Sequence, residues 1–179
     1  MRGILLFDID GVIRDVSESY RLAIQETVQH FTGWRPEMSN IDSLKSEGCW
    51  NNDWDASLGL IQLFKKTKNN SIKIPKRHEL ITIFNEFYFG GNPEGDPSSW
   101  KGFIQNEKLL IDKDFFKNLT LQDFKWGFFS GAEAASAKYI LTNRLELENP
   151  KLIAMGEVPG KPNPTGLIKL ASSLVGSEL

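Results

Sequence analysis

Residues 4–7 (Ile-Leu-Leu-Phe) are followed at once by Asp8, Asp10 and Gly11. Four apolar residues in a row are typical of a parallel strand that helices cover on both faces. Two acids separated by one residue project to the same side of an extended chain, about 6–7 Å apart at the backbone. In an open α/β sheet the ligand crevice lies at the carboxyl ends of the strands. The pattern therefore favours an α/β fold in which two carboxylates meet a metal ion or a phosphate.

A purely structural explanation exists for the same residues. An Asp at the end of a strand can close an Asx-type turn, with Gly11 supplying a positive φ. The rest of the chain has to decide between the two explanations.

The segment after Asp15 shows helical periodicity and no strand pattern as far as about Gly102. Four helices are expected: residues 17–31 ended by Gly33, a second from Ser39 with Asp42 in a capping box, residues 53–66, and a fourth whose first turn contains Pro75. Residues 92–99, rich in Pro and Gly, form the expected return linker. We therefore predict an all-helical insert over residues 16–102.

An alternation of helices and strands resumes after the insert. The expected elements are a helix over residues 114–121, a strand over 124–129, a helix over 132–145, a strand over 151–155 and a helix over 164–175. Right-handed crossovers of this kind build a parallel sheet whose strands all end at one edge. The predicted fold class is thus a Rossmann-like parallel α/β core with an inserted helical domain.

Three motifs in this order resemble those of the haloacid-dehalogenase-like (HAD) superfamily. The first is Phe-Asp-Ile-Asp-Gly-Val at residues 7–12, and the second is the strand that ends in Ser130 and Gly131. The third is Lys161, in the loop Gly-Lys-Pro-Asn-Pro that leads into a helix. Most members of this superfamily are Mg²⁺-dependent phosphatases, so the resemblance implies an enzyme of that class.

The resemblance assigns a role to each acid of the first motif. It implies that Asp8 is the nucleophile and forms an aspartyl-phosphate, which splits a difficult hydrolysis into two easier displacements. Asp10 would protonate the leaving alcohol and then deprotonate the attacking water, and a like-charged neighbour in a partly dry site favours the protonated form that this needs. Mg²⁺ would bridge the Asp8 carboxylate, the Asp10 backbone carbonyl and a phosphate oxygen.

The second and third motifs supply the expected phosphate-binding groups. Ser130 and the Gly131 amide stand where a strand meets a helix N-terminus, which is a ready anion site. Lys161 would steady Asp8 and the phosphate with a compact positive charge. Each residue also has a structural explanation, because Ser130 can merely cap the helix and Lys161 can be an ordinary surface lysine. The order of the motifs favours the functional explanation for both.

The resemblance also implies the domain layout and exposes one departure from it. Residues 1–15 and 103–179 would form the HAD-like core, and residues 16–102 would form the small helical cap of the first HAD subclass. The core strands would lie in the order three, two, one. The superfamily's fourth motif, a strand followed by an acidic pair, has no counterpart in the sequence. We therefore expect weak Mg²⁺ binding, with Glu157 as a poor substitute, and a first strand covered by more chain or by a second subunit.

The expected cap contains one unusual stretch, with two indoles, two amides and an acid: Trp50, Asn51, Asn52, Asp53 and Trp54. Residues 48–54, which contain this stretch, resemble a small group of first-subclass HAD proteins together with residues 7–15. Some of these are named imidazoleglycerol-phosphate dehydratase, a chemistry built on many histidine ligands, whereas this chain has two histidines. The stretch predicts either a specificity loop above the active site or ordinary packing with a helix cap. Arg14 either meets an acidic group of a substrate or is a surface residue.

Composition is consistent with a cytoplasmic enzyme and excludes several other classes. The 179 residues carry a net charge of −2 and no basic run, so neither nucleic acid nor an anionic membrane is an expected partner. A single cysteine, Cys49, excludes an internal disulfide. The favoured function is a Mg²⁺-dependent phosphomonoesterase that acts on a small phosphorylated metabolite. A phosphomutase, and a truncated HAD-like protein with little activity, are the alternatives.

Overall fold

The computed structural model describes residues 1–48, 50, 52–68 and 71–176, and the chain divides into two compact units. The core unit consists of Met1–Asp15 and Lys108–Leu179, and the helical unit consists of Val16–Glu107. Each unit has its own buried side chains and is described separately below.

A three-stranded parallel sheet, β1-β4-β5, forms the centre of the core unit. Its strands are β1 (Gly3–Phe7), β4 (Phe124–Phe129) and β5 (Leu152–Ile153). Phe7 pairs with Phe128, and Phe129 pairs with Ile153, so the three strands end at the same edge. The α/β class, the parallel sheet and the strand order expected from the sequence are confirmed.

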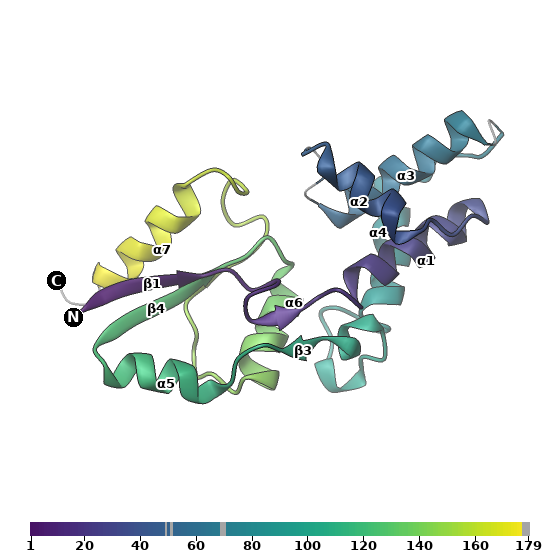
Figure 1. Ribbon diagram of the computed structural model, residues 1–179. Helices are drawn as coiled ribbons and strands as arrows, with labels where there is room; N and C mark the ends of the chain where they lie inside the picture. Colours follow the sequence, from purple (N-terminus) through teal and green to yellow (C-terminus); the bar gives the residue numbers. More distant parts are fainter. Residues whose placement is uncertain (49, 51, 69–70, 177–179) are drawn as a thin grey trace. The chain divides into compact units, whose positions relative to one another are not determined.

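Two helices cover the opposite faces of this sheet, α5 (Lys113–Leu121) on one and α7 (Thr165–Val175) on the other (Figure 1). Successive residues of β4 point to alternate faces, so Phe128 packs toward α5 and Phe129 toward α7. On the α5 side the Phe116 ring lies 4.7–5.5 Å from three strand rings, those of Phe7, Trp126 and Phe128. On the α7 side the buried cluster consists of Phe129, Ile153, Leu170 and Leu174.

Strand β5 is shorter than the expected 151–155 because its backbone leaves the sheet after Ile153. The Ala154 amide donates to the Glu157 carboxylate over 2.9 Å, and the Met155 amide donates to the Ala132 carbonyl over 3.0 Å. The helix expected over 132–145 consists of two parts, α6 (Ala134–Lys138) and a π-helical segment, Tyr139–Arg144.

A two-stranded antiparallel ribbon, β2 (Arg14–Asp15) with β3 (Lys108–Leu109), was not expected from the sequence. Its strands have two residues each, which is too short for an alternating pattern, and they come from opposite sides of the helical insert. The ribbon joins the end of the first core segment to the beginning of the second.

Four helices make up most of the helical unit: α1 (Tyr20–Thr32), α2 (Met38–Ser46), α3 (Asp53–Thr67) and α4 (Arg77–Tyr88). Helix α1 packs on both α3 and α4, and α2 packs on α3. The Tyr20 and Tyr88 rings stack with their centroids 4.3 Å apart. Helix α1 ends at Gly33 with a φ of 72°, the left-handed conformation expected of that glycine.

Three of these helices begin elsewhere than expected. Helix α1 begins at Tyr20 rather than at residue 17, and the Ser19 hydroxyl before it donates to Glu107 over 2.8 Å. Helix α2 has its capping box at Glu37 and Asn40, not at Ser39 and Asp42. Helix α4 has its N-cap at Lys76, so that Pro75 precedes the helix instead of lying in its first turn.

The helical unit extends to Glu107, beyond the expected boundary at residue 102. The short 3-10 helix Phe103–Asn106 contacts α1 and α4. The Gly102 amide donates to the Phe89 carbonyl over 2.8 Å, which holds the returning chain against the end of α4. Among the described residues, no helix is long and apolar enough to cross a membrane.

Gly166 is required where α7 crosses the sheet. A β-carbon at this position would stand 2.5 Å from the Phe129 ring, closer than van der Waals contact allows. We expect Gly166→Ala to lower the free energy of unfolding by about 1–3 kcal/mol, because the buried ring or the helix has to move. Urea denaturation measures this change. Gly176→Ala is the control, since a β-carbon there meets nothing within 4 Å, and an equally stable Gly166→Ala protein would contradict the prediction.

Candidate active site at the carboxyl edge of the sheet

Asp8 is the first residue after β1, and the structure pairs it with Lys161. Lys161 Nζ lies 2.8 Å from Asp8 Oδ2, and the Ile9 amide donates to Asp8 Oδ1 over 2.8 Å. The Asp8 side chain is 42% exposed and the Lys161 side chain is 40% exposed. An ion pair this exposed stabilises a fold by only about 0–1 kcal/mol. Both groups therefore remain accessible to a ligand.

Lys161 reaches this position from the loop between β5 and α7. Its Nζ also lies 5.1 Å from the centroid of the Phe129 ring, at the end of β4. The loop thus brings a cation to the strand end that carries Asp8. This geometry agrees with the functional explanation for Lys161, and its role toward a phosphate stays a prediction.

Asp10 is paired with Arg14, and the burial of Arg14 corrects one of the two interpretations of the arginine. Arg14 Nε donates to Asp10 Oδ1 over 2.8 Å, and the Arg14 side chain is fully buried. Arg14 is therefore not a surface residue. It pairs with the second carboxylate of the first motif and belongs to the core unit, not to the helical one. Contact with an acidic group of a substrate stays a prediction.

Ser130 follows β4 directly and is almost completely buried. Its amide donates to the Ile153 carbonyl over 3.0 Å, and its Oγ accepts from the Ala132 amide over 3.1 Å. The hydroxyl thus stabilises the turn that leads to α6, although the N-cap of that helix is Glu133 and not Ser130. Since Oγ is the acceptor in that bond, its proton can still be donated to a phosphate oxygen. Gly131 is exposed, and a β-carbon there would meet nothing within 4 Å.

Glu133 is a feature of this edge that the sequence did not indicate. It is the N-cap of α6, three residues after Ser130, and burial raises its pKa to about 7. The desolvation that shifts the pKa comes from tertiary packing, so no local pattern could have revealed it.

The stretch at 50–54 makes contacts within the helical unit that agree with ordinary packing. The Asn52 side chain caps α3 by accepting from the amides of Trp54 and Asp55, and Asp53 pairs with Lys45 over 2.6 Å. The Trp50 ring packs over Gly59 and its indole NH donates to Glu47 over 2.8 Å. Asn51 lies outside the described residues, so the prediction for it stays a prediction.

The oxygen atoms at this edge fit Mg²⁺ in kind but are few. Asp8 offers a half-exposed carboxylate, and carboxylate and carbonyl oxygens are the ligands that Mg²⁺ prefers. The Glu157 carboxylate accepts from the Ala154 amide of its own loop, which occupies one of its oxygens. Across residues 1–48, 50, 52–68 and 71–176, no group of three or more His, Cys, Asp or Glu side chains is placed to hold a metal ion.

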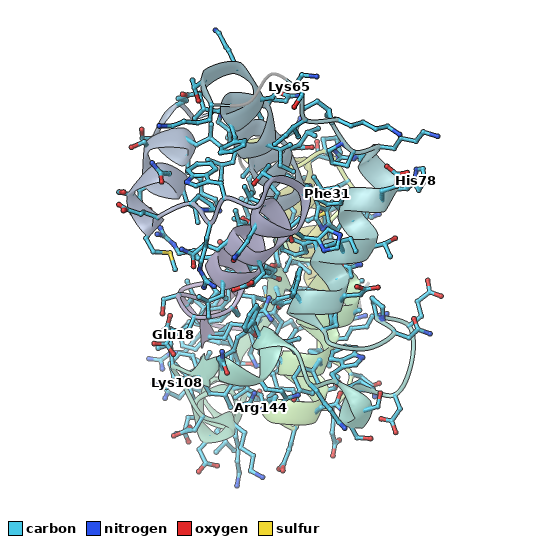
Figure 2. The ribbon with its side chains drawn as sticks, turned by 90° about the vertical axis from the view of Figure 1, so that its right-hand side faces the viewer. Glu18, Phe31, Lys65, His78, Lys108 and Arg144 are labelled. Carbon is cyan, nitrogen blue, oxygen red and sulfur yellow. The ribbon has the colours of Figure 1, made fainter. Side chains whose placement is uncertain are left out.

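The two histidines are exposed and lie on helices of the helical unit. Figure 2 shows His78 at the outer side of that unit, on α4. His30 lies in the last turn of α1. Neither residue belongs to the core unit that carries Asp8 and Lys161.

Comparison with known proteins gives one curated relative, and no family model matches the chain. The relative is an imidazoleglycerol-phosphate dehydratase from Phytophthora nicotianae, 31% identical over 177 residues. The match covers 97% of this chain but 36% of the relative, so the chain spans about a third of that protein's length.

Solved structures match almost the whole chain. Phosphatase Tt82 from Thermococcus thioreducens has a TM-score of 0.71 at 20% identity, covering 98% of this chain and 80% of its own. A putative β-phosphoglucomutase from Thermotoga maritima has a TM-score of 0.62 at 16% identity, and a family IA HAD hydrolase from Entamoeba histolytica one of 0.64 at 12%. Each of these two covers 98% of this chain and 71% of its own. The chain therefore has the fold of the HAD-superfamily hydrolases.

Proposed function

We propose that the protein is a phosphomonoesterase that works through a phosphorylated Asp8. The observation that supports this most directly is the 2.8 Å contact between Lys161 Nζ and Asp8 Oδ2 at the carboxyl edge of the sheet. Such an exposed pair adds little stability, yet it combines a carboxylate nucleophile with a cation that can accompany a phosphate. The fold shared with Phosphatase Tt82 supports the same class of reaction.

In the first chemical step an Asp8 carboxylate oxygen attacks the phosphorus atom and the bond from phosphorus to the leaving oxygen breaks. Asp10 donates its proton to that leaving oxygen, so the alcohol departs neutral. Lys161, the Ser130 hydroxyl and the Gly131 amide bind the phosphoryl oxygens while charge shifts among them.

In the second step a water oxygen attacks the same phosphorus atom and gives its proton to Asp10. The acyl-phosphate bond breaks, which returns the Asp8 carboxylate and releases inorganic phosphate. Asp8 and the Asp10 carbonyl are the proposed Mg²⁺ ligands, and bound Mg²⁺ would neutralise phosphoryl charge. Because so few protein ligands are proposed, we expect weak binding of the metal.

A phosphomutase is the second candidate, favoured by the structural similarity to a putative β-phosphoglucomutase. It would use the same aspartyl-phosphate but return the phosphoryl group to a sugar or another alcohol instead of to water. Release of inorganic phosphate from a monoester, with no phosphorylated second product, distinguishes the esterase from the mutase.

The dehydratase name of the curated relative finds no support in the described residues. The two histidines are exposed and no metal-ligating group of three is present among these residues.

We propose a small phosphorylated metabolite as substrate and the cytoplasm as location. Strand β1 has β4 on one side and no other strand in the described part of the chain. A second subunit or further chain is the proposed cover for that edge.

Variants of the two acids test this function. We expect Asp8→Asn to reduce hydrolysis of p-nitrophenyl phosphate to background, and removal of Mg²⁺ with EDTA to do the same. Asp10→Asn should cost about 10²–10⁴-fold in turnover while sparing phosphorylation of Asp8 by a reactive ester, since a good leaving group needs no proton. Steady-state rates and ³²P labelling of the protein measure these effects. Asp123→Asn, at the opposite end of β4, is the control, and an active Asp8→Asn protein would refute the proposal.

We further propose that the helical unit is a cap whose residues at 50–54 select the substrate. Asp53→Ala should change the ratio of kcat/KM between two metabolite phosphates by roughly tenfold and leave p-nitrophenyl phosphate hydrolysis nearly unchanged. A phosphatase screen over a metabolite panel measures the ratio. Thermal melting measures how much stability the variant loses with the Lys45–Asp53 ion pair. Asp42→Ala, which breaks a comparable ion pair with Arg21, is the control, and identical substrate profiles for all three proteins would contradict the cap assignment.

A further inference from the structure

Arg14 is among the largest completely buried side chains in the described part of the chain. It lies beside a carboxylate that is only partly buried, since the Asp10 side chain is 31% exposed. The Arg14 Nε to Asp10 Oδ1 distance of 2.8 Å is that of a charge-assisted hydrogen bond. A buried guanidinium therefore fixes one oxygen of an acid that stands at the solvent boundary.

A second contact of the same guanidinium extends to the segment after Ser130. Arg14 Nη2 donates to the Ser136 hydroxyl on α6 over 3.4 Å, and that hydroxyl donates to the Glu133 carbonyl over 3.2 Å. Arg14 thus connects the first motif to the helix that follows the phosphate-binding turn.

The backbone of Arg14 is held as firmly as its side chain. The Arg14 carbonyl accepts from the Gly11 amide over 2.8 Å, and the Arg14 amide donates to the Ile9 carbonyl over 3.2 Å. Arg14 also pairs with Leu109 in the β2–β3 ribbon. These contacts, all within the core unit, hold both the backbone and the guanidinium of Arg14.

We infer that Arg14 is a positioning residue for Asp10 in proton transfer. The inference rests on the proposed function, because it concerns the step in which Asp10 protonates the leaving oxygen. Arg14 holds Oδ1 and thereby fixes the direction in which Oδ2 points. A planar fork that binds a carboxylate on one side and a hydroxyl on the other restrains rotation of the carboxylate better than an ammonium group does.

Two aryl esters that differ in their leaving group separate this role from a merely structural one. Phenyl phosphate needs a proton on its leaving oxygen, whereas 2,4-dinitrophenyl phosphate does not. We expect Arg14→Met to reduce kcat for phenyl phosphate by about 100-fold, the usual cost of a misplaced catalytic group, with little change in KM. The pre-steady-state burst of dinitrophenolate should fall by less than about tenfold, because phosphorylation of Asp8 by this ester needs no acid.

Three further variants complete the experiment. Arg14→Lys should restore part of the phenyl phosphate rate, because it keeps the charge but loses the fork. Ser136→Ala should also lower the phenyl phosphate rate relative to the dinitrophenolate burst, by a smaller factor than Arg14→Met. It serves as the test if Arg14→Met fails to fold. Arg21→Met, which removes an arginine paired with Asp42 in the helical unit, should leave both rates unchanged. Thermal melting establishes that each protein is folded.

The outcomes distinguish failure of the inference from failure of the proposed function. Wild-type protein that hydrolyses neither ester in the presence of Mg²⁺ refutes the proposed function and the inference with it. Active wild-type protein with an unchanged rate ratio in Arg14→Lys and Ser136→Ala overturns the inference alone. Equal losses on both esters in every folded variant also overturn it, since they show a structural role.

Discussion

Parallel pairing of β1 with β4, and of β4 with β5, determines where the polar groups of the core unit lie. Because Phe7 is level with Phe128 and Phe129 with Ile153, the chain leaves all three strands at one edge. Asp8 and Ser130 are each the first residue beyond a strand, and the loop that follows β5 carries Lys161. A shift of one residue in this register would turn the aromatic side chains of β4 to the wrong faces. The packing of Phe128 and Phe129 therefore maintains the geometry of the site.

The two acids of the first motif have partners of different kinds, which suits the different tasks proposed for them. Asp8 faces an exposed lysine, a compact and hydrated charge that can give way to a phosphate or move with it. Asp10 faces a buried arginine that is fixed at its backbone and at its guanidinium. A nucleophile has to bond to the substrate, whereas an acid and base has to keep its orientation through two steps. The half-exposed lysine and the buried arginine match these needs.

The helical unit has polar contacts that tie its two ends together. Glu107, at its last position, accepts from the hydroxyls of Ser19 and Tyr88 over 2.8 and 2.9 Å. Within the core unit, the β2–β3 ribbon joins the two chain segments that leave and return. In each unit, the residues where the chain leaves and returns therefore contact one another: Arg14–Asp15 with Lys108–Leu109 in the core unit, and Ser19 with Glu107 in the helical unit. This arrangement explains why the boundary of the helical unit lies at Glu107 and not at the Pro- and Gly-rich linker.

The sequence alone indicated the class of fold, the three strands of the parallel sheet and the two acids that follow the first strand, because apolar runs and strand-end polar residues are local signals. It identified the residues at 124–129 as a strand and Gly33 as a helix end for the same reason. Only the tertiary structure decided the long-range contacts and the burial of polar side chains, which local signals do not encode. It placed Lys161 against Asp8, buried Arg14 beside Asp10, paired β2 with β3 and desolvated Glu133. Each of these depends on residues far apart in the chain that meet only when the sheet and its covering helices have packed.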